Sequence, residues 1–599
     1  MCGIIGYIGE QPARPRLVAG LEQLEYRGYD SAGIGLVDDG LSVFKQVGLV
    51  SGLDIPESTT QTCGIGHTRW STHGKPTDAN AHPHTDCSGR VAVVHNGIIG
   101  NYDELRTTLS DHEFTSETDT EVVAHLLEVE LERTDDLREA VSAVVAQIEG
   151  SYALGVVAAG YDGIIAARRN SPLVVGHGSD GNFIASDVTP LLAHTRSVSY
   201  LEDGDIAQVT REGVTIWQDG KPIDRERHTI EWSPDAAEKG GYDHYMLKEI
   251  HEQPTALRQA IAGRINGIEE GVDLSDLSLS EEFLASIDEI QFVACGTSYH
   301  ACLYAKQLIE EFADVRATVE FASEYSIGSG RDPERTLVVG VSQSGETADT
   351  LRALRMAHRV GIRTLGVTNT VGSTMARECD DALYIRAGPE IGVAATKTFA
   401  SQIIVLAMFA LTVAETRGEL DVTAGRELRR NLQGLPGAVQ GVLNQNEDIK
   451  AVAEAYADGE AFFFIGRRLG GPVSLEGALK LKEISYDHAE GFPAGELKHG
   501  PLALVTEETP VLAILTDGTR PEETQNNVKE VQARGAPVIA IAADGYRGGH
   551  DVEFEVPDLG LLEPLVANVY LQLFAYHVAN SKGRAIDKPR NLAKSVTVE

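Results

Sequence analysis

The sequence predicts an α+β domain of layered sheets at the N-terminus, followed by two α/β domains with doubly wound parallel sheets. Up to about residue 220, short strand-like runs occur in groups, with helical patterns between the groups. Further along the chain, strands and helices alternate, which is the pattern of a parallel sheet. This alternating pattern occurs twice, at a spacing of about 170 residues, so we expect two similar domains.

Domain boundaries follow from these changes in pattern. At roughly 100–200 residues per domain, a chain of 599 residues suggests three or four domains. The polar stretch 219–241 has the composition of a linker. We expect a first domain, a linker with a helical lead-in, two α/β domains and a C-terminal tail over 1–220, 221–280, 281–425, 426–586 and 587–599.

In the first domain, alternating or apolar runs predict strands at 2–8, 33–37, 63–67, 91–95, 153–158, 163–168, 183–185, 205–210 and 214–217. Helical periodicity predicts helices at 15–26, 101–110, 119–132 and 136–148. The strands outnumber the helices, as in a domain of packed sheets with helices outside.

In the rest of the chain, strands are predicted at 289–294, 336–341, 363–368, 382–385, 461–465, 510–515 and 537–542. Helices are predicted at 300–312, 348–360, 396–417, 474–486, 522–535 and 562–581. The apolar run 403–414 is about 12 residues long, which is too short to span a bilayer and suits a buried helix.

The chain is strongly acidic, with 89 Asp and Glu against 51 Lys and Arg and a net charge of −38. This balance excludes a general nucleic-acid-binding surface, which needs basic patches. It indicates a solvated acidic surface, and it suggests a salt-rich cytoplasm in which self-repulsion is screened.

Cysteine usage and the N-terminus indicate a reducing, cytoplasmic location. The six cysteines include no CxxC pair, and their spacing is not that of a disulfide framework or a zinc ribbon. The first residues contain neither a basic segment nor a long apolar run, so we expect no targeting or membrane segment.

Cys2 is the cysteine with a potential chemical role. Removal of the initiator Met before this small residue would leave a terminal Cys that carries both a thiol and an amine. The free amine has an ordinary pKa of about 7.7–8.0, so it can serve as the base for its own nucleophile. A Cys at this position is by itself weak evidence for a catalytic role, so the interpretation depends on the polar residues predicted around it.

Polar groups follow several strands of the first domain. Arg69, in the polar block 67–74, suits an α-carboxylate, because its fork matches two oxygens. Asn96 and Gly97 provide an amide and a backbone N–H for an oxyanion hole, although this pair is also a common turn. Asp119 is either an acceptor for an ammonium group or a helix N-cap. The histidines show no helical metal-binding spacing, so no metal is expected; they are His67, His73, His82, His84 and His95.

In the second part, two hydroxyl-rich loops, 295–298 and 342–347, each lie between a strand and a helix. Such loops bind anions at helix N-termini, or they only cap the helices. Two of them at neighbouring strand ends would face one crevice. The sequence lacks a nucleotide P-loop, and the GxGxxG match at 176–181 is interpreted as a turn because no helix follows it.

A predicted helix places Glu476, Lys480 and Glu483 on one side, either as a salt-bridged surface face or as a site. Lys594 lies in the tail, and a Lys amine is the group that forms imines with carbonyl compounds.

The motifs of the first domain resemble those of the class II glutamine amidotransferases of the N-terminal-nucleophile family, which have a layered αββα fold. The resemblance rests on segments 2–4, 24–33, 67–74, 95–98 and 117–121, in the family order. It implies Cys2 as the nucleophile, with a glutamyl thioester intermediate and an oxyanion hole of Asn96 and Gly97. It implies a glutamine site of Arg69, Trp70, Thr72, His73 and Asp119, with Trp70 beside the ammonia path.

The second part resembles sugar isomerase domains, and segments 390–397 and 590–599 extend the resemblance over essentially the whole chain, to the family of glutamine–fructose-6-phosphate aminotransferases. It implies a sugar-phosphate site of Thr297, Ser298, Ser342, Gln343, Ser344, Thr347, Val393, Lys480 and Ala593. It implies a Schiff base on Lys594, proton transfer by Glu483, and ring opening by His499 of a neighbouring subunit in a homodimer. Ala395 departs from the Ser that is frequent in the family, so one hydroxyl contact is lost.

The resemblance thus implies an enzyme that forms glucosamine 6-phosphate from glutamine and fructose 6-phosphate, with no cofactor. Ammonia would need a closed, dry path between two sites. A phosphoribosylamine- or asparagine-forming enzyme is disfavoured, because it would need a pyrophosphate or nucleotide site and a metal. A sugar-phosphate sensor would not need Cys2, Glu483 and Lys594 together.

Overall fold

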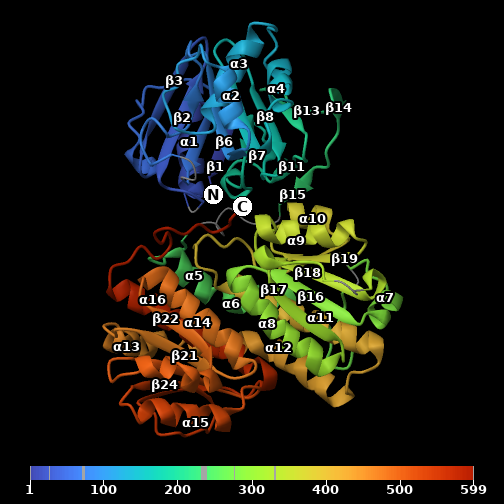
Figure 1. Cartoon of the computed structure of the whole chain (residues 1–599), viewed down its shortest axis with the longest axis vertical. Coiled ribbons are helices and arrows are strands. Elements are labelled where there is room, and N and C mark those ends of the chain that lie inside the picture. The colour runs from blue at the N-terminus through green and yellow to red at the C-terminus, as the bar shows by residue number, and fades with distance from the viewer. Residues whose placement is uncertain are drawn as a thin grey trace. The chain divides into compact units, whose positions relative to one another are not determined.

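The computed structural model describes residues 2–25, 27–70, 74–230, 239–274, 277–328 and 332–597. The chain divides into two compact units, each described here by itself (Figure 1). Unit 1 contains the described residues up to 230 together with 595–597, and unit 2 contains 239–594.

Unit 1 is built on two antiparallel sheets. The eight-stranded sheet has the order β15 (His228–Thr229), β11 (Ser197–Tyr200), β9 (Val174–His177), β10 (Gly181–Ala185), β1 (Gly3–Gly9), β4 (Cys63–Arg69), β2 (Ser31–Val37) and β3 (Leu41–Val47). The seven-stranded sheet has the order β14 (Lys221–Ile223), β13 (Val214–Gln218), β12 (Ile206–Val209), β8 (Ile164–Arg169), β7 (Gly150–Ala158), β6 (Val91–Ile99) and β5 (His84–Thr85).

The two sheets pack face to face, with helices on both outer faces. In β1, Ile4 and Ile8 enter the core between the sheets, whereas Ile5 and Tyr7 enter the core under a helix, as the two-residue period of a strand requires. The helices are α1 (Ala13–Leu24) on one face, and α2 (Tyr102–Thr108), α3 (Glu121–Leu131) and α4 (Leu137–Val145) on the other. The predicted layered αββα fold is confirmed.

The predicted start of the linker, at about residue 220, is too early. Residues 221–223 form β14, which pairs with β13, and residues 228–229 form β15, which pairs with β11. Backbone pairing at the sheet edges, rather than side-chain pattern, makes these polar residues part of unit 1.

Unit 2 contains two parallel sheets of five strands each. The first has the order β17 (Arg316–Phe321), β16 (Glu289–Ala294), β18 (Thr336–Ser342), β19 (Arg363–Thr368) and β20 (Asp381–Tyr384). The second has the order β22 (Ala489–Pro493), β21 (Phe462–Gly466), β23 (Val511–Leu515), β24 (Val538–Ala543) and β25 (Val552–Val556). Both sheets therefore run second–first–third–fourth–fifth in chain order, and this identity of topology confirms two similar α/β domains.

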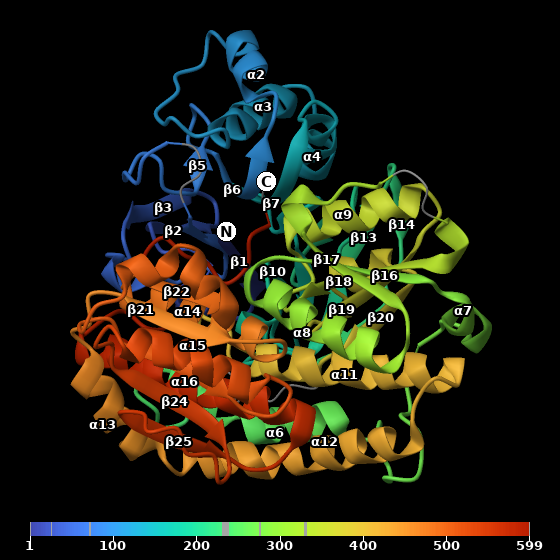
Figure 2. The same ribbon diagram turned by 60° about the horizontal axis from the view of Figure 1, so that its bottom comes forward.

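Helices cover both faces of each sheet (Figures 1 and 2). They are α5 (Tyr245–His251), α6 (Gln253–Ile261), α7 (Glu281–Ser286), α8 (Gly296–Phe312), α9 (Ala348–Arg359), α10 (Thr374–Glu378), α11 (Lys397–Arg417), α12 (Val422–Leu443), α13 (Asn446–Tyr456), α14 (Gly470–Ser485), α15 (Pro521–Gln532) and α16 (Glu563–Ser581). In the first sheet, Val338 packs toward α9, whereas Leu337 and Val339 pack toward α8 and α11.

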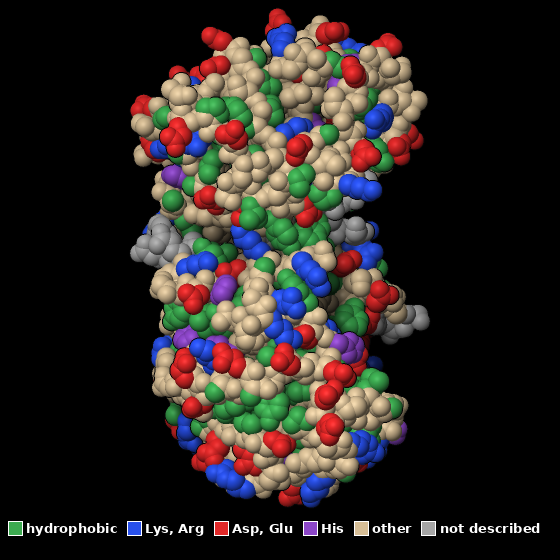
Figure 3. Space-filling model, turned by 90° about the vertical axis from the view of Figure 1, so that its left-hand side faces the viewer, with side chains coloured by type: hydrophobic (Ala, Val, Ile, Leu, Met, Phe, Trp, Pro, Cys, Tyr) green, Lys and Arg blue, Asp and Glu red, His purple; other side chains and the backbone are tan. Residues whose placement is uncertain are grey.

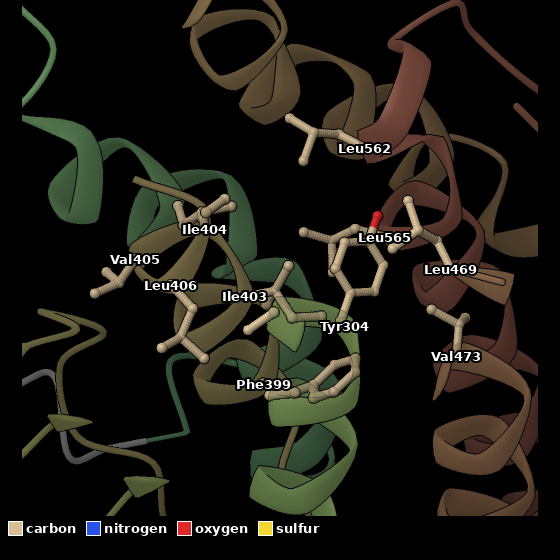
Figure 4. Packing of buried hydrophobic residues seen from close by; sticks show 14 of the residues in the cluster. Tyr304, Phe399, Ile403, Ile404, Val405, Leu406, Leu469, Val473, Leu562 and Leu565 are labelled. Atoms are coloured by element: carbon tan, nitrogen blue, oxygen red, sulfur yellow. The ribbon is translucent and has the colours of Figure 1, made fainter. Parts of the chain in front are cut away.

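One apolar core joins the two α/β domains of unit 2. Figure 4 shows Tyr304 of α8 beside Phe399 and Ile403 of α11, facing Val473 of α14 and Leu565 of α16. Helix α11 is long and apolar enough to cross a membrane, but 89% of its apolar window is buried inside the protein. It is the buried helix that the apolar run predicts.

The surface follows the composition. On the face drawn in Figure 3, Asp and Glu side chains lie among Lys and Arg over both units. The intermixing shows that the acidic excess is distributed over this face rather than gathered in one block.

Candidate active sites

In unit 1, Cys2 lies immediately before β1, beside the end of the neighbouring strand β4. Its half-buried thiol accepts a hydrogen bond from the backbone N–H of Trp70, with an N–Sγ distance of 3.2 Å. The side-chain amide of Asn96 donates to the Cys2 carbonyl oxygen at 3.0 Å. The pairing of β1 with β4 and the packing of the two sheets thus bring the three residues together.

The Asn96 amide is oriented by a buried histidine. The Nε2 atom of His67 lies 3.1 Å from Asn96 Oδ1 and 2.9 Å from the carbonyl oxygen of His95. Burial lowers the pKa of His67 to about 3, so its ring is neutral at physiological pH. Both partners are acceptors, so Nε2 carries the proton, and the Asn96 amide group remains turned toward Cys2.

Gly97 follows Asn96 on β6 and has a φ of +138°. A Cβ atom at this position would lie 2.0 Å from the Ser151 carbonyl oxygen, so only glycine fits. The sequence therefore has Gly here for a backbone reason as well as for a chemical one.

Two opposite charges lie near Cys2. Arg69 is the last residue of β4 and is only 4% exposed. Burial lowers the pKa of Arg69, while the nearby Asp119 carboxylate opposes that shift. Asp119 accepts a hydrogen bond from the Ile99 N–H at 2.8 Å, so the predicted N-cap of the following helix instead faces β6. An Arg and an Asp suit the carboxylate and ammonium groups of an amino acid.

Of the other residues predicted for the glutamine site, the structure describes Trp70. The Trp70 ring packs edge-on against Tyr29, with 5.9 Å between the ring centroids. Thr72 and His73 lie outside the described residues.

In unit 2, the two hydroxyl-rich segments follow β16 and β18, which are neighbours in the sheet. The predicted loop 295–298 is wrong in extent, because α8 already begins at Gly296. Ser342 Oγ lies 2.8 Å from Thr347 Oγ1 and accepts the Gly345 N–H at 3.1 Å. Gly345 has a φ of +67°, and a Cβ atom there would lie 2.2 Å from Ser373 Oγ. The loop is tightly wound and leads directly into α9, the arrangement of an anion site.

The other segment is the first turn of α8, at the same edge of the sheet. Ser298 Oγ accepts a hydrogen bond from Gln402 of α11 at 3.0 Å. Gln343 and Ser344 are half-buried in the neighbouring loop. The structure therefore brings these predicted residues to one edge of one sheet, where open α/β sheets bind ligands.

A group of buried charged side chains on α14, in the second α/β domain, contacts α8 of the first α/β domain. Lys480, fully buried on α14, lies 3.1 Å from Glu476, 2.7 Å from Glu483 and 3.0 Å from the Thr297 hydroxyl. Glu476 also accepts from Thr297 at 3.0 Å and contacts His300 Nδ1 at 2.8 Å. The helix face is thus a buried site and not a solvated salt bridge.

The three ionisable groups of α14 shift one another. Burial raises the pKa of Glu483, and Glu476 adds to this effect, whereas Lys480 opposes it. Burial would also raise the pKa of Glu476, but Lys480 and His300 hold it below its usual value. The two carboxylates outweigh burial and raise the pKa of Lys480. Of the two carboxyl groups, Glu483 is therefore the one that keeps its proton to the higher pH.

Lys594 lies at a second pair of buried carboxylates. Its ammonium group contacts Glu390 and donates to the Gly392 carbonyl oxygen at 2.8 Å. Although burial favours its neutral form, the charge of Lys594 lowers the pKa of Glu390 to about 2. Burial and the Glu390 charge together raise the pKa of Glu249, which accepts the Gly392 N–H at 3.1 Å, to about 8.

The tail is held beside this pair. The Val393 N–H donates to the Asp587 carbonyl oxygen at 3.1 Å, and Ala593 precedes Lys594 in a half-buried position. Ala395 is half-buried just before α11. His499, by contrast, is exposed at the end of the 3₁₀ segment η6 (Ala494–His499).

Sequence reasoning gave no role to His300, Gln402 or Glu390, which contact Glu476, Ser298 and Lys594. It gave none to Glu249 either, which accepts the N–H groups of Ile391 and Gly392. The feature of the sequence that could have pointed to these residues is a polar side chain inside an otherwise apolar, buried segment, such as Gln402 in α11. That signal becomes specific only after the partners are known.

Comparisons with known proteins identify both units. Residues 67–193 match the model described as glutamine amidotransferase domain, and residues 283–412 and 456–545 match the SIS domain. Glutamine–fructose-6-phosphate aminotransferases (isomerizing) align over the full length of both chains: 59% identity for Halobacterium salinarum, 49% for Thermus thermophilus and 47% for Methanosarcina mazei.

A solved structure agrees with the fold of unit 2. The C-terminal domain of glucosamine-fructose-6-phosphate aminotransferase from Francisella tularensis is 38% identical, with a TM-score of 0.56. It covers 58% of this chain and 99% of its own.

Proposed function

Because the chain belongs to the family of glutamine–fructose-6-phosphate aminotransferases (isomerizing), we propose that two separate sets of side chains carry the two half-reactions. The enzyme converts fructose 6-phosphate and glutamine to glucosamine 6-phosphate and glutamate. We assign glutamine hydrolysis to residues 1–230, and sugar chemistry to two domains over 281–425 and 426–586 with the tail.

In the first half-reaction, once the initiator Met has been removed, the Cys2 thiol attacks the side-chain amide of glutamine, and the free α-amine of Cys2 takes the thiol proton and passes it to the departing ammonia. Asn96 and the Gly97 N–H stabilise the oxyanion. Arg69 binds the α-carboxylate and Asp119 the α-ammonium group of the substrate. Ammonia leaves, and water releases glutamate from the thioester.

In the second half-reaction, the sugar phosphate binds to the loops after β16 and β18. Lys594 forms an imine with the C2 carbonyl of the opened sugar and releases water, and ammonia then displaces the Lys594 amine from that carbon to give the sugar imine. Glu483 transfers the proton between C1 and C2, and Lys480 keeps its carboxylate in place. Glu390 holds the Lys594 amine until the sugar arrives.

The exposure of His499 supports a homodimer in which each subunit supplies this residue to its partner for ring opening. Water-filled surroundings would protonate free ammonia, so a closed path between the two reactions is needed. We assign the enzyme to the cytoplasm. It uses two small-molecule substrates and neither nucleic acid nor membrane.

The observation that carries the proposal is the Asn96 amide, which His67 turns toward Cys2. The test is mass spectrometry of reactions of glutamine with fructose 6-phosphate, for the wild type, Cys2→Ala and Lys594→Met. We expect both variants to lose glucosamine 6-phosphate by about a thousandfold or more.

The two variants separate the half-reactions. Lys594→Met should still release glutamate, whereas Cys2→Ala should not. Cys379→Ala and Lys588→Met are matched controls for the residue types and should behave as the wild type. Glutamate release by Cys2→Ala would contradict the assignment of the nucleophile, and amino-sugar formation by Lys594→Met would contradict the imine.

A further inference from the structure

A cluster of four potential metal ligands lies in unit 1, outside the residues assigned to catalysis. It consists of Cys87, His112, His125 and Glu128, whose ligand atoms all lie within 4.8 Å of one another. From these contacts we propose that the four residues bind one zinc ion. None of the five histidines considered in the sequence analysis belongs to this cluster.

The distances within the cluster fit a tetrahedral site. Cys87 Sγ lies 3.6 Å from His112 Nδ1 and 3.5 Å from His125 Nδ1. Glu128 Oε2 lies 3.1 Å from His112 Nδ1 and 3.8 Å from His125 Nδ1. Zn–S bonds of about 2.3 Å and Zn–N bonds of about 2.0 Å at tetrahedral angles place neighbouring ligand atoms about 3.3–3.6 Å apart.

The sulfur and nitrogen ligand atoms of the cluster indicate which metal ion it would bind. A thiolate and two imidazoles are ligands of zinc and of softer transition metals, whereas calcium and magnesium prefer oxygen. Four protein ligands that converge on one point leave no position for substrate, which is the pattern of a structural site. Binding would release the Cys87 thiol proton to water.

Three separate segments supply the ligands. Cys87 lies in the turn between β5 and β6, which Asp86 fixes by accepting the N–H groups of Arg90 and Val91 at 2.8 Å. His112 lies in the loop between α2 and α3, and His125 and Glu128 are three residues apart on α3. The ion would therefore tie a hairpin, a loop and a helix together, as structural zinc does in small domains.

The geometry also links the cluster to the glutamine site. His125 Nε2 lies 3.9 Å from the buried Glu121 carboxylate and makes no hydrogen bond to any residue that the structure describes, so a small rotation of the ring would let it donate to that carboxylate while Nδ1 faces the ion. Glu121 accepts hydrogen bonds from Thr115 and Ser116 in the same loop, at 2.7–2.8 Å. This loop leads to Asp119, so the ion would hold in place the segment that carries a predicted glutamine-binding residue.

The first test is the metal content of full-length protein without an affinity tag, purified with zinc present and then dialysed. We expect about one zinc ion per chain in the wild type and in the controls Cys379→Ser and His488→Ala. We expect Cys87→Ser and His112→Ala to lose most of it. Cys87 is exposed, so its replacement should leave the fold intact, which circular dichroism would verify.

The second test uses cobalt(II) in place of zinc. A thiolate-to-cobalt absorption band in the wild type that disappears in Cys87→Ser would identify the sulfur ligand directly. Chelation should lower the Tm and raise the KM for glutamine of the wild type, and it should change neither in Cys87→Ser. A wild type without zinc, or zinc retained at the wild-type level by Cys87→Ser and His112→Ala, would overturn the proposal.

Discussion

The two candidate active sites of this enzyme handle charge in opposite ways. Around Cys2, the groups that contact the nucleophilic residue are the Asn96 amide and the Trp70 backbone N–H, and the histidine that orients Asn96 is kept neutral by burial. Around Lys480 and Lys594, the contacting groups are buried carboxylates and ammonium groups. The direct hydrogen-bond partners of Cys2 are thus neutral dipoles, whereas Lys480 and Lys594 are held by ion pairs.

The difference follows from the proposed chemistry. An oxyanion that forms for a moment is best met by fixed neutral donors, which need no countercharge before the reaction. Proton shuttling along a sugar needs groups that change charge, and buried pairs can tune their pKa values. Each buried ion pair must be complete, because removal of one partner leaves an uncompensated charge.

Among variants that leave the proposed nucleophile Cys2 and the imine-forming Lys594 in place, the largest effect should come from Glu483→Gln, which removes the group that changes charge at the sugar. A general acid–base group contributes about 10²–10⁴-fold, so glucosamine 6-phosphate formation should fall by about a thousandfold. Glutamate release should remain near the wild-type rate. Coupled assays of both products measure this separation.

Glu447→Gln is the control, since the Glu447 side chain is 82% exposed. If Glu483→Gln kept its rate of amino-sugar formation, the charged site would have another proton carrier.

Asn96→Ala should cause the next largest effect, on the opposite site. Loss of one oxyanion-hole donor costs about 10²–10³-fold in kcat. We expect that loss in glutamate release, with a nearly unchanged KM for glutamine, in steady-state kinetics. Asn101→Ala removes a surface amide in the same domain and should have little effect. A main effect on KM would mean that Asn96 binds the substrate rather than its transition state.

The sequence predicted most of this architecture, because strands that are buried on one or two faces carry a clear apolar period. Helix α12 was not predicted, since it contains Pro436 and four glycines and forms because it packs against α6 and α16. The edge strand β3 was not predicted either, because its residues are half-buried and it is held by pairing with β2.

For the sites, the motifs predicted the residues that we propose to contact the substrates, and they predicted few of the residues that hold these in place. Glu390 and His300 lie far in sequence from the lysine and glutamate that they contact. Their roles depend on distances across unit 2, which no local pattern contains.

A smaller effect should follow from His67→Phe, which keeps the ring but removes the N–H that orients Asn96. We expect glutamate release to fall by about tenfold, since one hydrogen bond to an amide contributes about 0.5–1.5 kcal/mol. The double variant with Asn96→Ala should be no worse than Asn96→Ala alone. Since burial keeps His67 neutral, the pH profile should not move. A shifted profile would show that His67 titrates and that the site is not neutral.

The smallest change in rate, and the most specific, should come from Glu476→Gln. The Glu476 charge raises the pKa of Glu483, so its removal should lower that pKa and move the acid limb of amino-sugar formation to lower pH. The rate at neutral pH should fall less than about tenfold, because a glutamine can still hydrogen-bond Thr297 and Lys480 still pairs with Glu483. The rates of formation of both products, measured between acidic and neutral pH, give the position of this acid limb, and glutamate release is the internal control. If the acid limb stays in place, Glu483 does not titrate in the rate-limiting step. If it moves to higher pH, the substitution raises the pKa of Glu483, and the Glu476 charge does not control that pKa as we expect. The dipolar site has no counterpart to this variant, because none of its contacts to Cys2 depends on a neighbouring carboxylate for its protonation state.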